Sequence, residues 1–145
     1  MDGEQRNRGI ELAVNGEIIK GLRFNGGTAL IAADQKKTTN GTYDGKRAIG
    51  VPGYTINGNI EYDLPFLKGG TLTGQVMRTG HQWANNANTL RVPGWTRFDL
   101  GARYTFLVTH KAMTVRFGVE NLADTPYWTS AFGGYLLQGM PRTCK

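Results

Sequence analysis

Hydrophobic and polar residues alternate along much of this chain with a period of two, which is the pattern of a β-strand with one apolar face. The clearest stretch is 54–63, where every even-numbered residue is apolar or glycine and every odd-numbered residue is polar. Residues 95–106 repeat the pattern, and weaker versions occur at 8–14, 22–33, 71–81 and 112–121. The sequence therefore predicts about six strands.

The lengths of these strands and of their connections favour a membrane barrel. Strands that cross a bilayer at a tilt need roughly nine to eleven residues, whereas soluble strands favour about five or six. The connections alternate between short and long, as they do in outer-membrane barrels. The short ones are 15–21, 64–70 and 107–111, and the long ones are 34–53, 82–94 and 122–141. The predicted fold is all-β, an antiparallel transmembrane β-barrel segment, with a soluble β-sandwich or barrel that binds a small apolar ligand as the alternative.

Composition and side-chain chemistry agree with this interpretation. The chain has 21 glycines, which disfavours long helices, and no apolar run approaches the ~18 residues of a membrane-spanning helix. The polar positions of the strands are mainly Thr, Asn, Gln, Arg, Asp and Glu, which suit a hydrated interior. Tyr54, Tyr62, Trp95 and Phe106 lie near strand ends, where an aromatic girdle is expected.

The net charge of +6 does not by itself indicate nucleic acid. The basic residues are scattered, and the two adjacent pairs, Lys36-Lys37 and Lys46-Arg47, have no recognition helix or RNA-binding signature beside them. We therefore expect no nucleic-acid partner. The single Cys144 cannot form an internal disulfide or a CxxC site, and the first residues lack the basic and apolar regions of an export signal.

Few residues suggest catalysis or metal binding. His81 and His110 fall at opposite ends of the predicted strands, so we expect neither to be a metal ligand. The only serine, Ser130, falls in a predicted loop, and no base or orienting residue is suggested beside it. We predict no catalytic residues and no metal site.

Two groups of residues are candidates for binding. The first is a charge ladder on the polar face of two neighbouring strands, expected to face the lumen. Its members are Arg97, Asp99, Arg103, Arg116 and Glu120. Mutual pairing of buried charges is the preferred interpretation of this ladder, and a transport role is the alternative.

The second group consists of aromatic residues in the long loops, where they could face a ligand. Its members are Tyr43, Trp83, Trp128, Phe132 and Tyr135. Together with the basic pairs of the first long loop, they suit an anionic or catecholate-like chelate, although such aromatics also serve as girdle anchors.

Several segments together resemble a known family. They are residues 3–12 (GEQRNRGIEL), 46–52 (KRAIGVP), 61–65 (EYDLP), 95–104 (WTRFDLGARY), 119–128 (VENLADTPYW) and 139–143 (GMPRT). They resemble the C-terminal barrel region of TonB-dependent ferric-siderophore receptors, the ferrichrome-type branch especially. The segment 119–128 is the most specific, because in that family it closes the penultimate strand and opens the last extracellular loop.

The resemblance implies uptake rather than catalysis. Family members have a signal peptide, a coupling box, a plug domain and a roughly 22-stranded barrel in the bacterial outer membrane. They bind a ferric siderophore, contact a TonB-type coupling protein through the N-terminal region, and carry iron inside its chelator, so no protein cofactor is expected. Residues 1–145 would be the C-terminal part of the barrel domain, with neither plug nor signal peptide and with the final aromatic-ended strand missing. We expect such a fragment not to transport alone.

Overall fold

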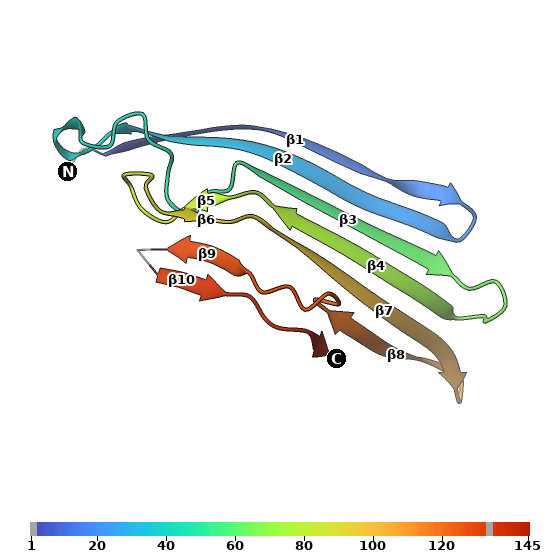
Figure 1. Ribbon diagram of the computed structural model, residues 1–145. Helices are drawn as coiled ribbons and strands as arrows, with labels where there is room; N and C mark the ends of the chain where they lie inside the picture. Colours follow the sequence, from blue (N-terminus) through green and yellow to red (C-terminus); the bar gives the residue numbers. More distant parts are fainter. Residues whose placement is uncertain (1–2, 133–134) are drawn as a thin grey trace.

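The computed structural model describes residues 3–132 and 135–145, and one antiparallel sheet dominates them (Figure 1). The sheet has seven strands in the order β1-β2-β3-β4-β7-β8-β11. These strands are β1 (Glu4–Ile19), β2 (Leu22–Lys37), β3 (Tyr54–Asp63), β4 (Gly70–Thr79), β7 (Trp95–Val108), β8 (Lys111–Glu120) and β11 (Thr143–Cys144). The sequence-based prediction of an all-β fold with six long strands is confirmed.

The long loops contain short elements of their own, and they leave the sheet at one end (Figure 1). The first holds a 3-10 turn, η1 (Thr39–Gly41), and the second holds the hairpin β5 (Gln82–Trp83) and β6 (Arg91–Val92). The third holds β9 (Trp128–Phe132) and β10 (Tyr135–Gln138). We call this end of the sheet the loop end and the opposite end, with the short connections, the turn end. Across the described ranges, no helix is both long and apolar enough to cross a membrane.

The first strand differs from the prediction. Residues 15–19 were expected in a turn, but β1 continues to Ile19 and pairs Asn15 with Asn25 and Glu17 with Arg23. The turn is only Lys20 and Gly21, with Gly21 at φ +83°, a conformation that glycine adopts without steric cost. Asn15 and Gly16 are residue types that favour turns. Here they remain in the strand, because β2 is long enough to pair with β1 along this stretch as well.

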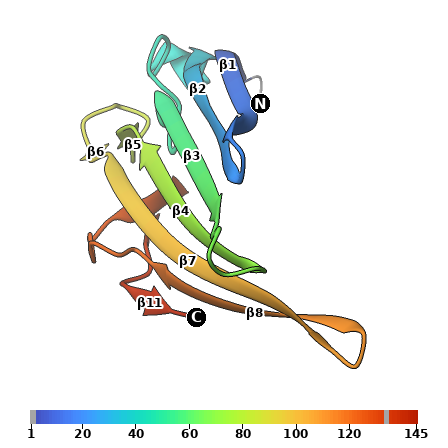
Figure 2. The ribbon, with the colours of Figure 1, turned by 90° about the vertical axis from the view of Figure 1, so that its right-hand side faces the viewer.

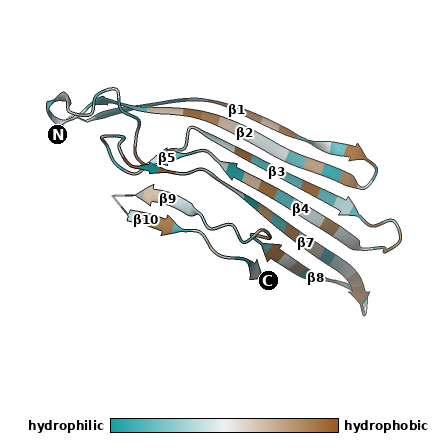
Figure 3. Cartoon of the chain, in the orientation of Figure 1, coloured by the Kyte–Doolittle hydropathy of each residue, from teal (hydrophilic) through white to brown (hydrophobic). Residues whose placement is uncertain are grey.

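The apolar face of the sheet is exposed. Along β3 the even-numbered residues form this apolar face and the odd-numbered residues form the polar face, and the register carries both across the sheet. Side chains on the apolar face remain uncovered, including Ile10 at 73%, Leu100 at 52% and Val115 at 58%. Bands of apolar residues cross the strands in Figure 3. In the part of the chain described, no second layer covers this face, so the alternative of a soluble sandwich with these residues as its core is wrong.

The buried apolar residues lie at the loop end instead of along the sheet. Ala84, Val92 and Ala131 form a small cluster against which Ile49 packs. These residues come from all three long connections, so the loops pack on one another.

The sheet is curved and open (Figure 2). Its first edge is β1, and its other edge is β8 with the short β11, where Thr143 pairs with Glu120 and Cys144 with Val119. The strand that follows the last loop, expected to be missing, is thus represented by these two paired residues.

Candidate functional site

The polar face of the sheet carries rows of hydrogen-bonding side chains that run across neighbouring strands. The register places one such row across the sheet, with one residue from each of β1, β2, β3, β4 and β7. Its members are Asn15, Asn25, Asn59, Gln75 and Asp99. Because side chains directly opposite on one face are neighbours, these rows make a continuous hydrophilic surface.

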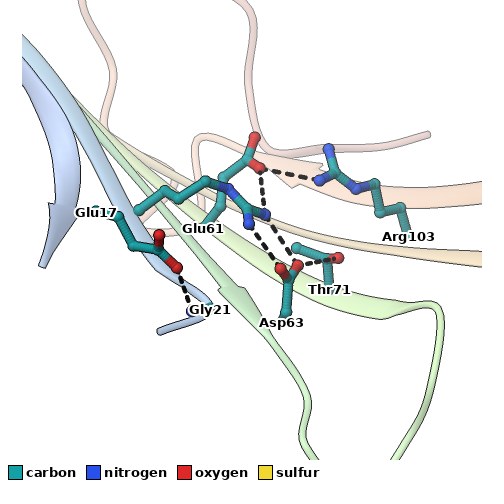
Figure 4. A network of polar contacts seen from close by, with 7 residues as sticks. Glu17, Gly21, Glu61, Asp63, Thr71 and Arg103 are labelled. Carbon is teal, nitrogen blue, oxygen red and sulfur yellow. Dashed lines mark hydrogen bonds and ion pairs between the residues drawn. The ribbon is translucent and has the colours of Figure 1, made fainter. Parts of the chain in front are cut away.

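A network of ion pairs occupies the polar face nearer the turn end (Figure 4). Arg23 donates to both carboxylate oxygens of Asp63, at 2.6 and 2.9 Å, and to Glu61 at 3.2 Å. Arg103 donates to the same Glu61 oxygen at 2.9 Å, and the Thr71 hydroxyl donates to Asp63 at 2.8 Å. The network therefore ties together β2, β3, β4 and β7. The sequence analysis did not select Arg23, Glu61 or Asp63. All three are odd-numbered residues on the polar face of neighbouring strands, and this shared position could have indicated them.

The predicted charge ladder lies on this face, where it forms separate pairs. Arg97 pairs with Asp99 at 2.8 Å within β7, and Arg103 pairs with Glu61 of β3. Glu120 pairs with Lys145 at 2.7 Å. Arg116 lies directly opposite Arg103 in the register. The five predicted residues also line one hollow of about 350 Å³ on the polar face.

Asn121 joins the end of β8 to the last long loop and to the chain that follows it. Its side chain is 1% exposed and makes three hydrogen bonds. The amide Nδ2 donates to the carbonyl oxygens of Thr125 at 3.0 Å and Met140 at 3.1 Å, while Oδ1 accepts from the Thr125 N–H at 3.0 Å. Its own N–H donates to Asp99 at 2.8 Å. Asn121 has φ 53°, a left-handed conformation that asparagine tolerates better than most residues.

Aromatic packing continues this junction toward the loop end. The hydroxyl of Tyr127 accepts a hydrogen bond from Arg97 at 3.2 Å, and its ring packs on Trp95 with the centroids 4.3 Å apart. Gly139 passes against the Tyr127 ring so closely that a Cβ would overlap the ring. The segments 119–128 and 139–143, which stood out in the sequence, therefore meet in space through one buried asparagine and one buried tyrosine.

The first and second long loops are also linked by hydrogen bonds. The Arg47 N–H donates to the Asn88 side chain at 2.7 Å, and the Asn88 amide donates back to the Arg47 carbonyl at 3.0 Å. Gly50 donates from its N–H to the Trp83 carbonyl at 2.9 Å. Gly50 has φ +71°, and a Cβ there would overlap the carbonyl oxygen of Ala131. A loop cluster held in this way presents a defined surface.

The five loop aromatics occupy different parts of this cluster. Tyr43 lines a hollow of about 440 Å³ with Gln35, Lys37 and Asn86, and the other four aromatics do not line it. Trp83 is in β5 and packs edge-on against His81 with the centroids 6.1 Å apart.

The other three aromatics belong to one hairpin. Trp128 begins β9, and Phe132 pairs with Tyr135 across from β10. Trp128 is 38% exposed and Tyr135 is 78% exposed, whereas the side chain of Phe132 lies outside the described part. The aromatics are thus distributed over the loop end instead of converging on one pocket.

The histidines remain apart, as the spacing predicted. His81 is beside the second long loop, and His110 is in the turn between β7 and β8. Over residues 3–132 and 135–145, no group of three or more His, Cys, Asp or Glu side chains is placed to hold a metal ion.

A wall of long antiparallel strands, apolar outside and hydrophilic inside, with its long loops at one end, is the architecture of an outer-membrane barrel. Residues 2–122 match the family described as TonB dependent receptor-like, beta-barrel. This chain belongs to that family. The TonB-dependent receptor barrel therefore accounts for the exposed apolar face, which in this family faces lipid.

Individual relatives of this TonB-dependent receptor segment support the assignment. The ferrichrome receptor FcuA of Yersinia enterocolitica is 43% identical over 99% of this chain and 19% of the receptor. A ferrichrome outer membrane transporter and phage receptor of Escherichia coli is 30% identical over 92% of this chain and 18% of the transporter. The crystal structure of BauA, the ferric preacinetobactin receptor of Acinetobacter baumannii, superposes with a TM-score of 0.91 at 38% identity, covering 99% of this chain and 22% of BauA. The chain spans about a fifth of the length of these relatives.

Proposed function

We propose that this chain is the C-terminal part of the barrel domain of an outer-membrane receptor for energy-coupled uptake of ferric siderophores. The observation that carries the proposal is the sheet itself, in which an uncovered apolar face and a hydrophilic face are continued by three interlocked long loops at one end. Relatives over nearly the whole chain bear the names of ferrichrome and ferric preacinetobactin receptors.

In this proposal the two ends of the sheet have different tasks. The loop end faces the outside of the cell, where the loop cluster with Tyr43, Trp83, Trp128, Phe132 and Tyr135 contributes to the rim that receives the chelate. Iron arrives inside its siderophore as cargo, so the protein needs no iron ligand or other cofactor of its own. The polar face lines the lumen, and the chain acts as part of a transporter without catalysing a reaction. A TonB-type coupling protein would act through an N-terminal region of the receptor outside these residues.

The proposal is tested by transplantation into a relative. In the ferrichrome receptor of Yersinia enterocolitica, residues 1–145 replace the matching segment, and the product is called the chimera. We expect the chimera to restore ferrichrome-dependent growth to a receptor-deficient strain, because the polar face, the apolar face and the Asn121 junction are all carried over. A control chimera carries Leu100→Lys on the apolar face, where a charge at the centre of the bilayer costs about 2–4 kcal/mol.

The two chimeras are compared by their amount in the outer membrane and by the growth that they support. If the parent chimera reaches the outer membrane and supports growth while the Leu100→Lys chimera is present in smaller amount, the assignment of faces and function stands. A parent chimera that is made but stays in a water-soluble fraction would overturn it. Residues 1–145 expressed alone are expected to give no uptake, and iron-dependent growth supported by them alone would contradict the proposed role as one part of a larger receptor.

A further inference from the structure

Two arginines lie opposite each other on the polar face of the sheet. Arg103 of β7 and Arg116 of β8 are direct partners in the register. Like charges directly opposite on neighbouring strands destabilise a sheet. Arg103 donates to Glu61 at 2.9 Å (Figure 4), but across the described residues no carboxylate lies within 4.0 Å of Arg116. The repulsion within this arginine pair is therefore only partly compensated.

The carboxylates on the β3 side of the pair are shared with a third arginine. The Glu61 oxygen that accepts from Arg103 also accepts from Arg23. Both oxygens of Asp63 accept from Arg23 as well. Three arginines, Arg23, Arg103 and Arg116, thus face two carboxylates, Glu61 and Asp63, which leaves one positive charge in this part of the polar face.

The carboxylates on the loop-end side of the pair have cations of their own. Asp99 pairs with Arg97 at 2.8 Å, and Glu120 pairs with Lys145 at 2.7 Å. Neither of them compensates Arg116, so the remaining positive charge calls for an anion from outside the described residues.

A recess lies beside the arginine pair, one row nearer the loop end. Its floor is formed by Gly101 and Gly118, which are direct partners in the register. Thr73 continues this row on one side and Lys145 on the other. The recess belongs to the hollow of about 350 Å³, a volume within the range of roughly 300–1,000 Å³ that is usual for small-molecule sites. The recess therefore has room for a small molecule.

The groups around the recess suit an oxyanion. Arginine forms paired, charge-assisted hydrogen bonds with carboxylate oxygens, and an anion between Arg103 and Arg116 would remove their repulsion. A Cβ at Gly101 would overlap the Thr73 hydroxyl, so this hydroxyl lies over the floor of the recess, where it can bond to a polar group of the ligand. Hydroxycarboxylates combine both features, and their oxygens also chelate ferric iron.

We propose that Arg103, Arg116 and the recess over Gly101 and Gly118 form a binding site for a small carboxylate-bearing anion, with hydroxycarboxylate chelates as its ligand class. The site rests on the proposed function, because it requires the polar face to line the lumen of a receptor. It lies on the strands, apart from the loop aromatics, so cargo would reach it after leaving the rim. Arg116 then favours chelates with free carboxylates over neutral ones.

The test measures citrate binding to the purified chimera in detergent by equilibrium dialysis. Arg116→Gln removes the uncompensated charge. Gly118→Leu fills the recess and keeps every charge, and a Cβ at Gly118 has its nearest contact at 3.7 Å, so the backbone accommodates it. Arg78→Gln is the matched control, because Arg78 lies on the opposite, apolar face of the same sheet and also has no carboxylate within 4.0 Å in the described part of the chain.

We expect Arg116→Gln to weaken citrate binding at least about tenfold, the effect of losing a charge-assisted hydrogen bond. Gly118→Leu should weaken it at least as much, and Arg78→Gln should leave it unchanged. An equal loss with Arg78→Gln would show diffuse attraction to basic residues and overturn the site. Citrate binding that survives Gly118→Leu would show an anion held without the recess, and would also overturn it.

Absence of citrate binding to the parent chimera would overturn the site as well. In that case, a melting temperature of Arg116→Gln below that of the parent would identify a carboxylate of the receptor itself as the group that compensates Arg116. Ferrichrome uptake separates this proposal from the one on which it rests. If the parent chimera supports uptake but binds no citrate, only the carboxylate site is wrong. If it neither inserts nor supports uptake, the proposed function fails and the carboxylate site fails with it.

Discussion

Replacing Asn121 should release the last long loop from the barrel wall. Asn121→Gly removes three side-chain hydrogen bonds while keeping a residue that adopts φ 53° without strain. At about 1 kcal/mol for each lost hydrogen bond, the docked loop loses about 3 kcal/mol relative to an open state. That energy raises the open population about 100-fold. Asn121→Ala should have a larger effect, because alanine also strains the left-handed backbone.

Limited proteolysis of the purified chimera measures this opening directly, since the cleavage rate follows the open population when reclosing is fast. We expect cleavage within 122–141 to accelerate about 100-fold in Asn121→Gly. Asn40→Ala is the control, because Asn40 has nearly the same φ, 57°, but lies exposed in the first long loop. It should leave cleavage in 122–141 unchanged. Rates within about threefold of the parent for both Asn121 variants would refute the idea that this asparagine holds the loop.

Three further substitutions test the loop cluster, the faces and the polar network. Gly50→Ala places a Cβ on a carbonyl oxygen of the third long loop, so proteolysis of the first long loop should accelerate. Gly45 has a similar positive φ but open space around it, so Gly45→Ala should have a much smaller effect. Leu100→Lys should reduce the folded, membrane-inserted fraction by the equivalent of about 2–4 kcal/mol, whereas Gln75→Lys on the polar face of the same sheet should be tolerated. The amount of each variant is measured in fractionated membranes. An equal loss of both variants from the membrane fraction would contradict the assignment of faces. Glu61→Gln leaves two arginines without their shared carboxylate, so the melting temperature in detergent should fall, and added salt should narrow the difference from the parent.

Period-two alternation was sufficient to predict that six long strands occur and which face of each is apolar, although it placed the first two at 8–14 and 22–33, shorter than the observed β1 and β2. It located β3 at its observed bounds and separated the exposed apolar residues from the polar ones. The end of β1 was mistaken, since Asn15 and Gly16 resemble a turn when read without their partners in β2. At this position, pairing along the whole β1–β2 hairpin outweighs the preference of the two residues for a turn.

The junction and the loop cluster were not predictable in the same way. Asn121 bonds to residues 99, 125 and 140, and nothing in the sequence around it indicates that these positions meet. The charge ladder was recognised as a set on one face, but the carboxylate that serves Arg103 comes from β3, two strands away in the sheet. Such contacts depend on register and curvature, which a single strand pattern does not specify.

The hairpin within the last long loop also affects how the chain closes on itself during assembly. β8 and β11 pair across the whole of that loop, and bringing such distant residues together costs conformational entropy that grows with the logarithm of the free chain length. Pairing of β9 with β10 shortens the free chain beforehand, and each halving lowers that cost by about 0.6 kcal/mol. The loop can therefore assist the pairing of the following strand, β11, with β8 as well as contribute to the surface at the loop end.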